Sequence, residues 1–130
     1  MKSFLLDTNI IVDALRGRKG RHLLIDRLLG QGQPLASCPV TVTEIYAGMR
    51  SHEEKLTRAF MQSLLFLAIT AEIAEQAGLL KARYSKLGKT LSFQDATIAA
   101  VAIAYGCTLV TENIKDFPMP ELDLYPLPLA

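Results

Sequence analysis

Three acidic residues stand where a strand-like segment ends or a helical segment begins. Asp7 follows the apolar run Phe4-Leu5-Leu6 and precedes a helical pattern, and Glu44 and Asp95 lie near the starts of two further predicted helices. In an open α/β sheet, ligands bind in the crevice beyond the carboxyl ends of the strands. Three carboxylates delivered to one crevice would form a site for a cation.

Each of these acids also has a purely structural explanation as a helix cap. Asp7 could cap a helix through its side-chain oxygen, Thr41-Val42-Thr43-Glu44 fits the capping box, and Ser92-Phe93-Gln94-Asp95 fits its looser form. Taken singly, capping is favoured. For the three acids together, the capping explanation is weaker. Asp7 and Asp95 adjoin apolar segments, where a buried carboxylate is costly without a cation or several hydrogen-bond donors. Both roles are compatible, since a helix N-terminus favours an ionised carboxylate.

The types of the candidate ligands indicate which cation and which reaction would fit. Oxygen ligands without His or Cys favour Mg²⁺ or Mn²⁺ over zinc, and we expect His22 and His52, in charged surroundings, at the surface. Such a site suits phosphodiester hydrolysis, because a metal ion lowers the pKa of a bound water and stabilises charge on the attacking and leaving oxygens. The sequence has no evident catalytic triad or nucleophilic Cys and no phosphate-binding loop of the G-x-x-x-x-G-K-[ST] type.

The segment from Leu109 to Phe117 is expected to add polar groups at the same edge of the sheet. A strand ends at Val110, so Thr111, Asn113 and Asp116 follow its carboxyl end. The alternative is a polar turn in which Asn113 holds the turn geometry and Asp116 caps it.

One dense basic cluster follows the helix that begins beside Asp7. A solvated loop is the usual meaning of such a cluster, whereas contact with the phosphate backbone of a nucleic acid would be its functional meaning. The sequence leaves both open for Arg16, Arg18, Lys19 and Arg21.

Short strands and helices alternate along the chain and must position these residues. Apolar runs predict strands at residues 3–6, 34–37, 107–110 and 122–125, and residues 65–69 fit either a strand or the end of a helix. Helical patterns cover residues 8–15, 22–29, 41–48, 52–64, 70–87 and 92–105, the last nearly apolar on every side. The alternation predicts an α/β fold with a mostly parallel sheet.

Composition limits the class of protein. The 130 residues predict a single domain over residues 1–130, and a net charge of +1 excludes a polybasic chain, so a nucleic-acid site would have to be local. Cys38 and Cys107 are distant in sequence and are read as reduced, buried thiols of a cytoplasmic protein. We see no export signal and no apolar stretch near the roughly 20 residues that span a bilayer.

Taken in order, the motifs resemble those of a PIN-domain ribonuclease. They are Leu6-Asp7-Thr8-Asn9, Thr43-Glu44-Ile45 with Gly48, Asp95-Ala96, and Leu109 to Phe117. Each motif is weak alone, but the ordered set is specific and covers essentially the whole chain. Size and pattern most resemble the VapC-type toxins of type II toxin–antitoxin systems.

The resemblance implies a fold, an activity and partners. The fold would be a PIN-like three-layer sandwich, a central sheet of about five strands flanked by helices. The activity would be Mg²⁺- or Mn²⁺-dependent endoribonuclease cleavage of structured RNA, tRNA or rRNA, which inhibits translation. The protein would be a homodimer, neutralised by a small antitoxin whose C-terminal segment covers the active-site groove.

The resemblance also implies roles for individual residues. Asp7, Glu44 and Asp95 would form the acidic metal site, and Thr8, Asn9 and Thr111 would be supporting hydrogen-bonding residues. The family often has Asp where this chain has Asn113, which can ligate through its carbonyl but brings no charge. Asp116 would then take over, which predicts one well-held metal ion and leaves a weak second ion open.

Two other functions stay open at this point. One is a housekeeping PIN nuclease in RNA maturation. The other is a phosphoacceptor or binding domain without nuclease activity, with Asp7 as the phosphorylated residue.

Overall fold

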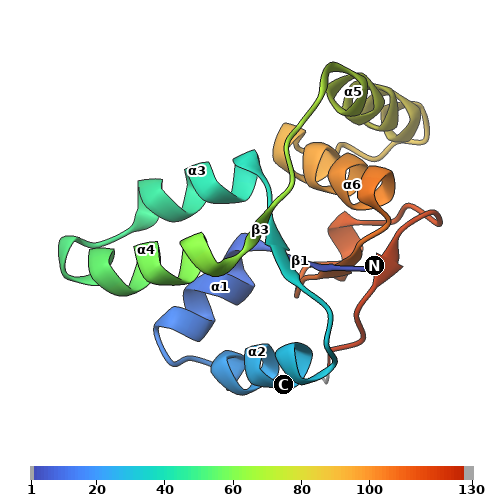
Figure 1. The fold of residues 1–130 in the computed structure, drawn as a ribbon. Helices are drawn as coiled ribbons and strands as arrows, with labels where there is room; N and C mark the ends of the chain where they lie inside the picture. The colour runs from blue at the N-terminus through green and yellow to red at the C-terminus, as the bar shows by residue number, and fades with distance from the viewer. Residues whose placement is uncertain (1, 128–130) are drawn as a thin grey trace.

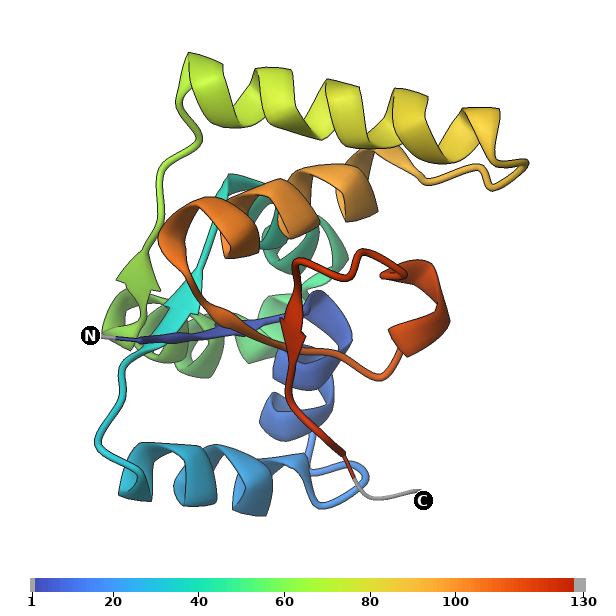
Figure 2. The ribbon, with the colours of Figure 1, turned by 90° about the vertical axis from the view of Figure 1, so that its right-hand side faces the viewer.

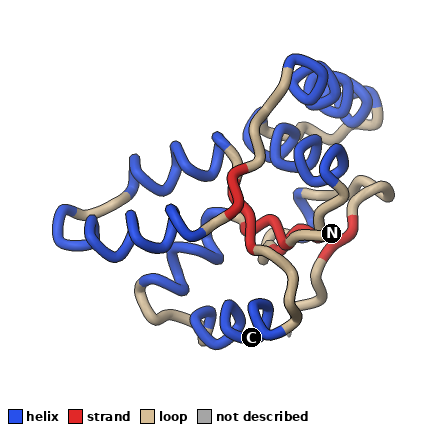
Figure 3. Tube along the Cα trace, in the orientation of Figure 1, coloured by secondary structure: helices blue, strands red, loops and turns tan. Residues whose placement is uncertain are grey.

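Five short strands form one parallel sheet in the computed structural model, which describes residues 2–127; Met1 and residues 128–130 lie outside the described part. The strand order is β3-β2-β1-β4-β5. The strands are β1 (Phe4–Leu6), β2 (Leu35–Ser37), β3 (Leu65–Phe66), β4 (Thr108–Val110) and β5 (Asp123–Leu124). Figures 1 and 3 show the sheet at the centre with helices on both faces, so the predicted α/β sandwich is confirmed.

Six α-helices and two short 3₁₀ turns connect the strands. The helices are α1 (Thr8–Leu15), α2 (Arg21–Gly30), α3 (Pro39–Gly48), α4 (Glu54–Ser63), α5 (Ala71–Lys86) and α6 (Phe93–Tyr105). The turns are η1 (Ser51–Glu53) and η2 (Ile114–Asp116). In the part of the chain from residue 2 to residue 127, none of the helices combines the length and apolar character needed to cross a membrane.

The central strand β1 joins the two halves of the core. Successive side chains of a strand point to opposite faces of its sheet. Leu5 accordingly packs in the cluster built by α5 and α6, whereas Phe4 and Leu6 pack in the cluster built mainly by α1 and α2. Figure 2 shows α5 and α6 stacked on one face and α1 and α2 on the other. The apolar run is fully buried because both faces of the sheet are covered.

Helix α6 lies between the sheet and α5, as its nearly uniform apolar character predicted. Its small side chains Ala96, Ala99, Ala100 and Ala102 are all buried. Ser92 caps its start by accepting the Asp95 N–H at 3.0 Å, and Gly106 ends it with a left-handed φ of 67°. The helix therefore presents Asp95 at its first turn, on a rigid element.

Two predicted helix starts are wrong. α3 begins at Pro39, whose fixed φ and missing N–H suit the first helical position, so Cys38 and not Thr41 is the N-cap. Thr41 is fully buried inside α3, and Thr41-Val42-Thr43-Glu44 is not a capping box. The predicted helix over residues 52–64 is divided into the 3₁₀ turn η1 and α4, where the Glu53 carboxylate accepts the Arg50 N–H at 2.8 Å.

The strand order creates a crevice between β1 and β4. The chain leaves β1 toward β2 and β3 on one side, and then returns to place β4 and β5 on the other side of β1. At such a reversal the connections diverge beyond the carboxyl ends of the two neighbouring strands. Asp7 directly follows β1 and Thr111 directly follows β4, so both lie at this crevice.

Candidate active site

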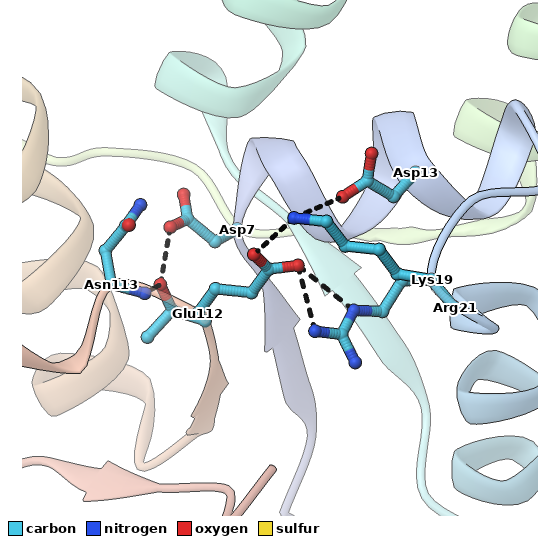
Figure 4. Close-up of polar contacts among 7 residues, drawn as sticks. Asp7, Asp13, Lys19, Arg21, Glu112 and Asn113 are labelled. Atoms are coloured by element: carbon cyan, nitrogen blue, oxygen red, sulfur yellow. Dashed lines mark hydrogen bonds and ion pairs between the residues drawn. The ribbon is translucent and has the colours of Figure 1, made fainter. Parts of the chain in front are cut away.

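Asp7 is a buried residue that both caps α1 and contacts the end of β4. One of its carboxylate oxygens accepts the Thr8 N–H at 2.9 Å, which confirms the predicted cap. The other accepts the Thr111 hydroxyl at 2.7 Å, across 104 residues of sequence (Figure 4). The Thr111 oxygen in turn accepts the Asn113 N–H at 3.0 Å. Capping is thus only part of the role of Asp7, because Thr8 after β1 and Thr111 after β4 together hold its carboxylate in a fixed orientation.

Glu44 reaches the same place from the middle of α3. The Thr8 hydroxyl donates to the Glu44 carboxylate at 2.8 Å. Since α3 begins five residues before Glu44, no capping function explains this acid. Thr8 therefore connects two of the predicted acids, through its N–H to Asp7 and through its hydroxyl to Glu44.

Asp95 faces the other acids from the first turn of α6. Burial raises the pKa of its carboxyl, and the negative charges of Asp116, Asp7 and Glu44 raise it further, while the Ser92 contact opposes the shift. The structure thus brings four acids from α3, α6, η2 and the start of α1 within electrostatic range of one another. Asn9 is exposed on α1.

The acidic site offers the oxygen donors that a hard cation requires, but its side chains lie too far apart to hold one ion together. Within residues 2–127, no three acidic, histidine or cysteine side chains lie close enough to hold one metal ion. The acids are all carboxylates, and burial together with the charges of Asp116, Asp7 and Glu44 disfavours the ionised form of Asp95. Oxygen donors with excess negative charge fit Mg²⁺ or Mn²⁺. The predicted ligand roles of Asp7, Glu44, Asp95, Asn113 and Asp116 stay predictions.

A groove of about 260 Å³ runs from the acids along α1, α3 and α4. Thr8 and Glu44 line its acidic end, Val12, Leu15 and Ile45 line its apolar part, and Arg16 and Glu53 lie along its length. Of the four acids of the site, only Glu44 lines this groove.

The predicted basic cluster is largely paired with acids of the same chain. Arg16 forms two hydrogen bonds with Glu53, at 2.8 and 3.1 Å, and Lys19 and Arg21 both pair with Glu112, at 3.0 and 2.9 Å. Arg18 is exposed. The idea that the cluster is only a solvated loop is wrong for Arg21, which is buried.

Two acids in these pairs were not identified from the sequence as site residues. Glu53 is half-buried, and the Arg16 guanidinium and the Arg50 N–H lower its pKa to about 2. Glu112 lies 91 residues from Arg21, and no local pattern could join them. The other side chains agree with expectation, since Cys38 and Cys107 are free and buried, and His22 and His52 are exposed.

Comparison with known proteins places this geometry in a family. The PIN domain model matches residues 4–118. The ribonuclease VapC19 of Mycobacterium tuberculosis is 34% identical over 119 residues, which cover 91% of this chain and 95% of that protein. The ribonuclease VapC2 of Haemophilus influenzae is 29% identical over 122 residues, covering 90% and 91%.

Solved structures agree with the sequence matches. VapBC2 from Rickettsia felis, crystallised with a DNA fragment from their promoter, superposes with a TM-score of 0.82 at 26% identity, covering 95% of this chain and 97% of that one. A toxin–antitoxin complex from Klebsiella pneumoniae superposes with a TM-score of 0.76 at 30% identity, covering 91% and 93%. On its fold, its ordered acids and these matches, this chain belongs to the PIN-domain family, among the relatives of the VapC ribonucleases.

Proposed function

We propose that this protein is a Mg²⁺- or Mn²⁺-dependent endoribonuclease, the toxin of a toxin–antitoxin pair. The observation that carries the proposal is the convergence of four acids at the β1–β4 crevice, where the charges of Asp7, Glu44 and Asp116 add to burial in disfavouring the ionised form of Asp95. Such repulsion costs stability unless a cation is bound there. The ribonuclease names of the relatives support the same reaction.

The residues of the chain have distinct tasks in this reaction. A divalent ion bound by Asp7, Glu44 and Asp95 supplies Lewis-acid stabilisation of charge on phosphate oxygens. The Thr8 N–H and the Thr111 hydroxyl fix the carboxylate of Asp7, and the Thr8 hydroxyl fixes that of Glu44. Asn113 and Asp116 add an amide oxygen and a carboxylate at the edge of the site. Asn9 is a supporting polar residue.

The basic segment after α1 contributes the contact with RNA in this proposal. Arg18 and Lys19 are exposed, and Arg16 lines the groove that leads to the acids. Arg21 is buried against Glu112 and holds the segment in place instead of reaching RNA. Structured RNA, tRNA or rRNA, is the proposed substrate, and the cytoplasm is the proposed site of action.

A small antitoxin is the proposed regulating partner. The solved relatives include VapBC and other toxin–antitoxin complexes. The groove between α1, α3 and α4 begins at Glu44 and continues over the apolar side chains of Val12 and Leu15. An antitoxin segment lying in it would cover Glu44 and bury apolar surface. We further propose a homodimer, which light scattering of the purified protein tests.

The decisive experiment is cleavage of total RNA by the purified protein, with and without divalent ions. Cleavage should require Mg²⁺ or Mn²⁺, and mapping of the new RNA ends should identify the substrate. Equal cleavage in EDTA would refute the metal-dependent mechanism. Growth arrest on expression, relieved by coexpression of an adjacent small gene product, separates a toxin from an RNA-maturation nuclease.

A further inference from the structure

Glu112 joins the basic segment after α1 to the loop that follows β4. One oxygen of its carboxylate accepts hydrogen bonds from the Nε and Nη2 atoms of Arg21, at 3.1 and 2.9 Å. Its other oxygen accepts from the Nζ atom of Lys19 at 3.0 Å. Lys19 Nζ also lies 3.8 Å from the carboxylate of Asp13 on α1. Figure 4 shows these residues together beside Asp7, and we call Glu112, Lys19 and Arg21 the clasp.

The Arg21–Glu112 pair of the clasp is largely shielded from solvent, whereas the Lys19 side chain is exposed. The Arg21 side chain is 10% exposed and that of Glu112 is 23% exposed. Burial alone raises the pKa of the Glu112 carboxyl, but Arg21 and Lys19 outweigh it, so the pKa lies below its usual range. Removing Glu112 would leave the buried guanidinium of Arg21 without its partner, which is strongly unfavourable.

The backbone at Lys19 indicates that its position is imposed by the surrounding structure. Its φ of 55° makes it the one non-glycine residue with a positive φ in residues 2–127. A lysine held in the left-handed region persists only when its surroundings determine it, and such strain concentrates at functional sites. In this protein its ion pairs with Glu112 and Asp13 hold the side chain.

Glu112 directly follows Thr111, whose hydroxyl orients the carboxylate of Asp7. We propose that Glu112 is a positioning residue: through Arg21 and Lys19 it fixes the loop after β4, so that Thr111 keeps its hydrogen bond to Asp7. This inference rests on the proposed nuclease function for its kinetic consequence. The hydrogen bond from the Asn113 N–H to Thr111 belongs to the same fixed loop.

The charges of the clasp add a second consequence. Glu112 offsets part of the positive charge of Lys19 and Arg21 at the edge of the acidic site. Without it, Lys19 and Arg21 would oppose binding of a cation by Asp7 and would attract RNA phosphates. Loss of Glu112 should therefore weaken metal binding and lower kcat, while KM for RNA stays the same or falls.

The test compares Glu112→Gln with Glu121→Gln. Glu121 pairs with Arg83 at 3.1 Å on the α5 side, so the control removes the same charge from another arginine pair. For Glu112→Gln we expect a fall of about tenfold in Mn²⁺ affinity, measured calorimetrically without RNA, and a similar fall in kcat. The Asn113 amide should exchange its hydrogen faster than in the wild type. The control should retain wild-type values.

Unchanged Mn²⁺ affinity and unchanged exchange at Asn113 in a folded Glu112→Gln variant would overturn the inference, as would equal losses in the control. If Glu112→Gln does not fold, Lys19→Gly tests the same clasp, because glycine relieves the strained φ while Arg21 stays paired. It should give faster hydrogen exchange at the Asn113 amide, and wild-type exchange would overturn the inference. Wild-type protein that binds Mn²⁺ but cleaves no RNA would refute the proposed function alone, since the binding and exchange measurements need no RNA.

Discussion

Thr111 donates a hydrogen bond to Asp7 and precedes Glu112 in the sequence. The carboxylates of these two acids differ in their partners. Glu112 is matched by two cations of the same chain, with N···O distances of 2.9 and 3.0 Å. Among residues 2–127, the Asp7 carboxylate receives an N–H and a hydroxyl but no cation, and the charge of Asp7 contributes to the raised pKa of Asp95. Acids matched by the fold stabilise it, whereas acids left unmatched at one edge are available to an external cation.

The variant with the largest expected effect on this comparison is Asp7→Asn. Asparagine can still accept the Thr8 N–H, so the cap is kept while the charge is lost. We expect RNA cleavage to fall by about 100-fold or more, since the metal ion contributes several kcal/mol to such reactions. Initial rates with Mg²⁺ check this. Cleavage within a few-fold of wild type in a folded variant would exclude Asp7 from the site.

A bound divalent cation should offset the negative charge of the acidic site and so stabilise the folded state. An ion that binds only the folded state at 100 times its dissociation constant stabilises by about 2.7 kcal/mol, a rise in Tm on the order of 10 °C. Mg²⁺ or Mn²⁺ should raise the Tm of the wild type more than that of Asp95→Asn, by differential scanning calorimetry. Identical shifts in the two proteins would count against a shared site.

Without metal, Asp95→Asn should be slightly more stable than the wild type. The raised pKa of Asp95 means that the folded state disfavours its ionised form, and this penalty is full above the raised pKa. We expect a gain of roughly 2 °C in Tm at pH 7 in EDTA. The gain should fade as the pH falls through the raised pKa and should vanish below 3.8, the ordinary pKa, where the carboxyl becomes protonated in both states. A lower Tm for the variant would mean that the charge of Asp95 is matched by the fold.

A matched acid should behave in the opposite way, and Glu53 provides the smallest test. Its pKa is lowered from 4.5 to about 2 by Arg16, so its contribution to stability is complete above pH 4.5 and is lost as the pH falls toward 2. Glu53→Gln should lower the Tm at pH 7 by about 3 °C, and the difference should close near pH 2. Glu54→Gln, in an exposed pair with Arg58, is the control and should change the Tm less.

The local part of this structure was predictable, and the long-range part was not. The strand before Asp7, the caps Thr70 and Ser92, and the ending of α6 at Gly106 follow from periodicity and capping rules that act within a few residues. The start of α3 was missed because Pro39 at the first helical position outweighed Thr41 as a cap.

The candidate site divides in the same way. Order and residue type sufficed to select Asp7, Glu44 and Asp95. The hydrogen bond from Thr8 to Glu44 depends on how α1 packs against α3, and the Arg21–Glu112 pair depends on β4 lying beside β1. Such contacts join residues whose distance in sequence carries no periodic signal, so they become visible only in three dimensions.

The position of β4 in the sheet also determines when the acidic site can form during translation. Thr111 is synthesised 104 positions after Asp7, and β4 must pair with β1 before the two side chains can meet. At about 5–20 residues per second, that interval lasts roughly 5–20 seconds. The acidic site is therefore completed only after Thr111 has been synthesised, so a chain without β4 lacks the hydroxyl that orients Asp7.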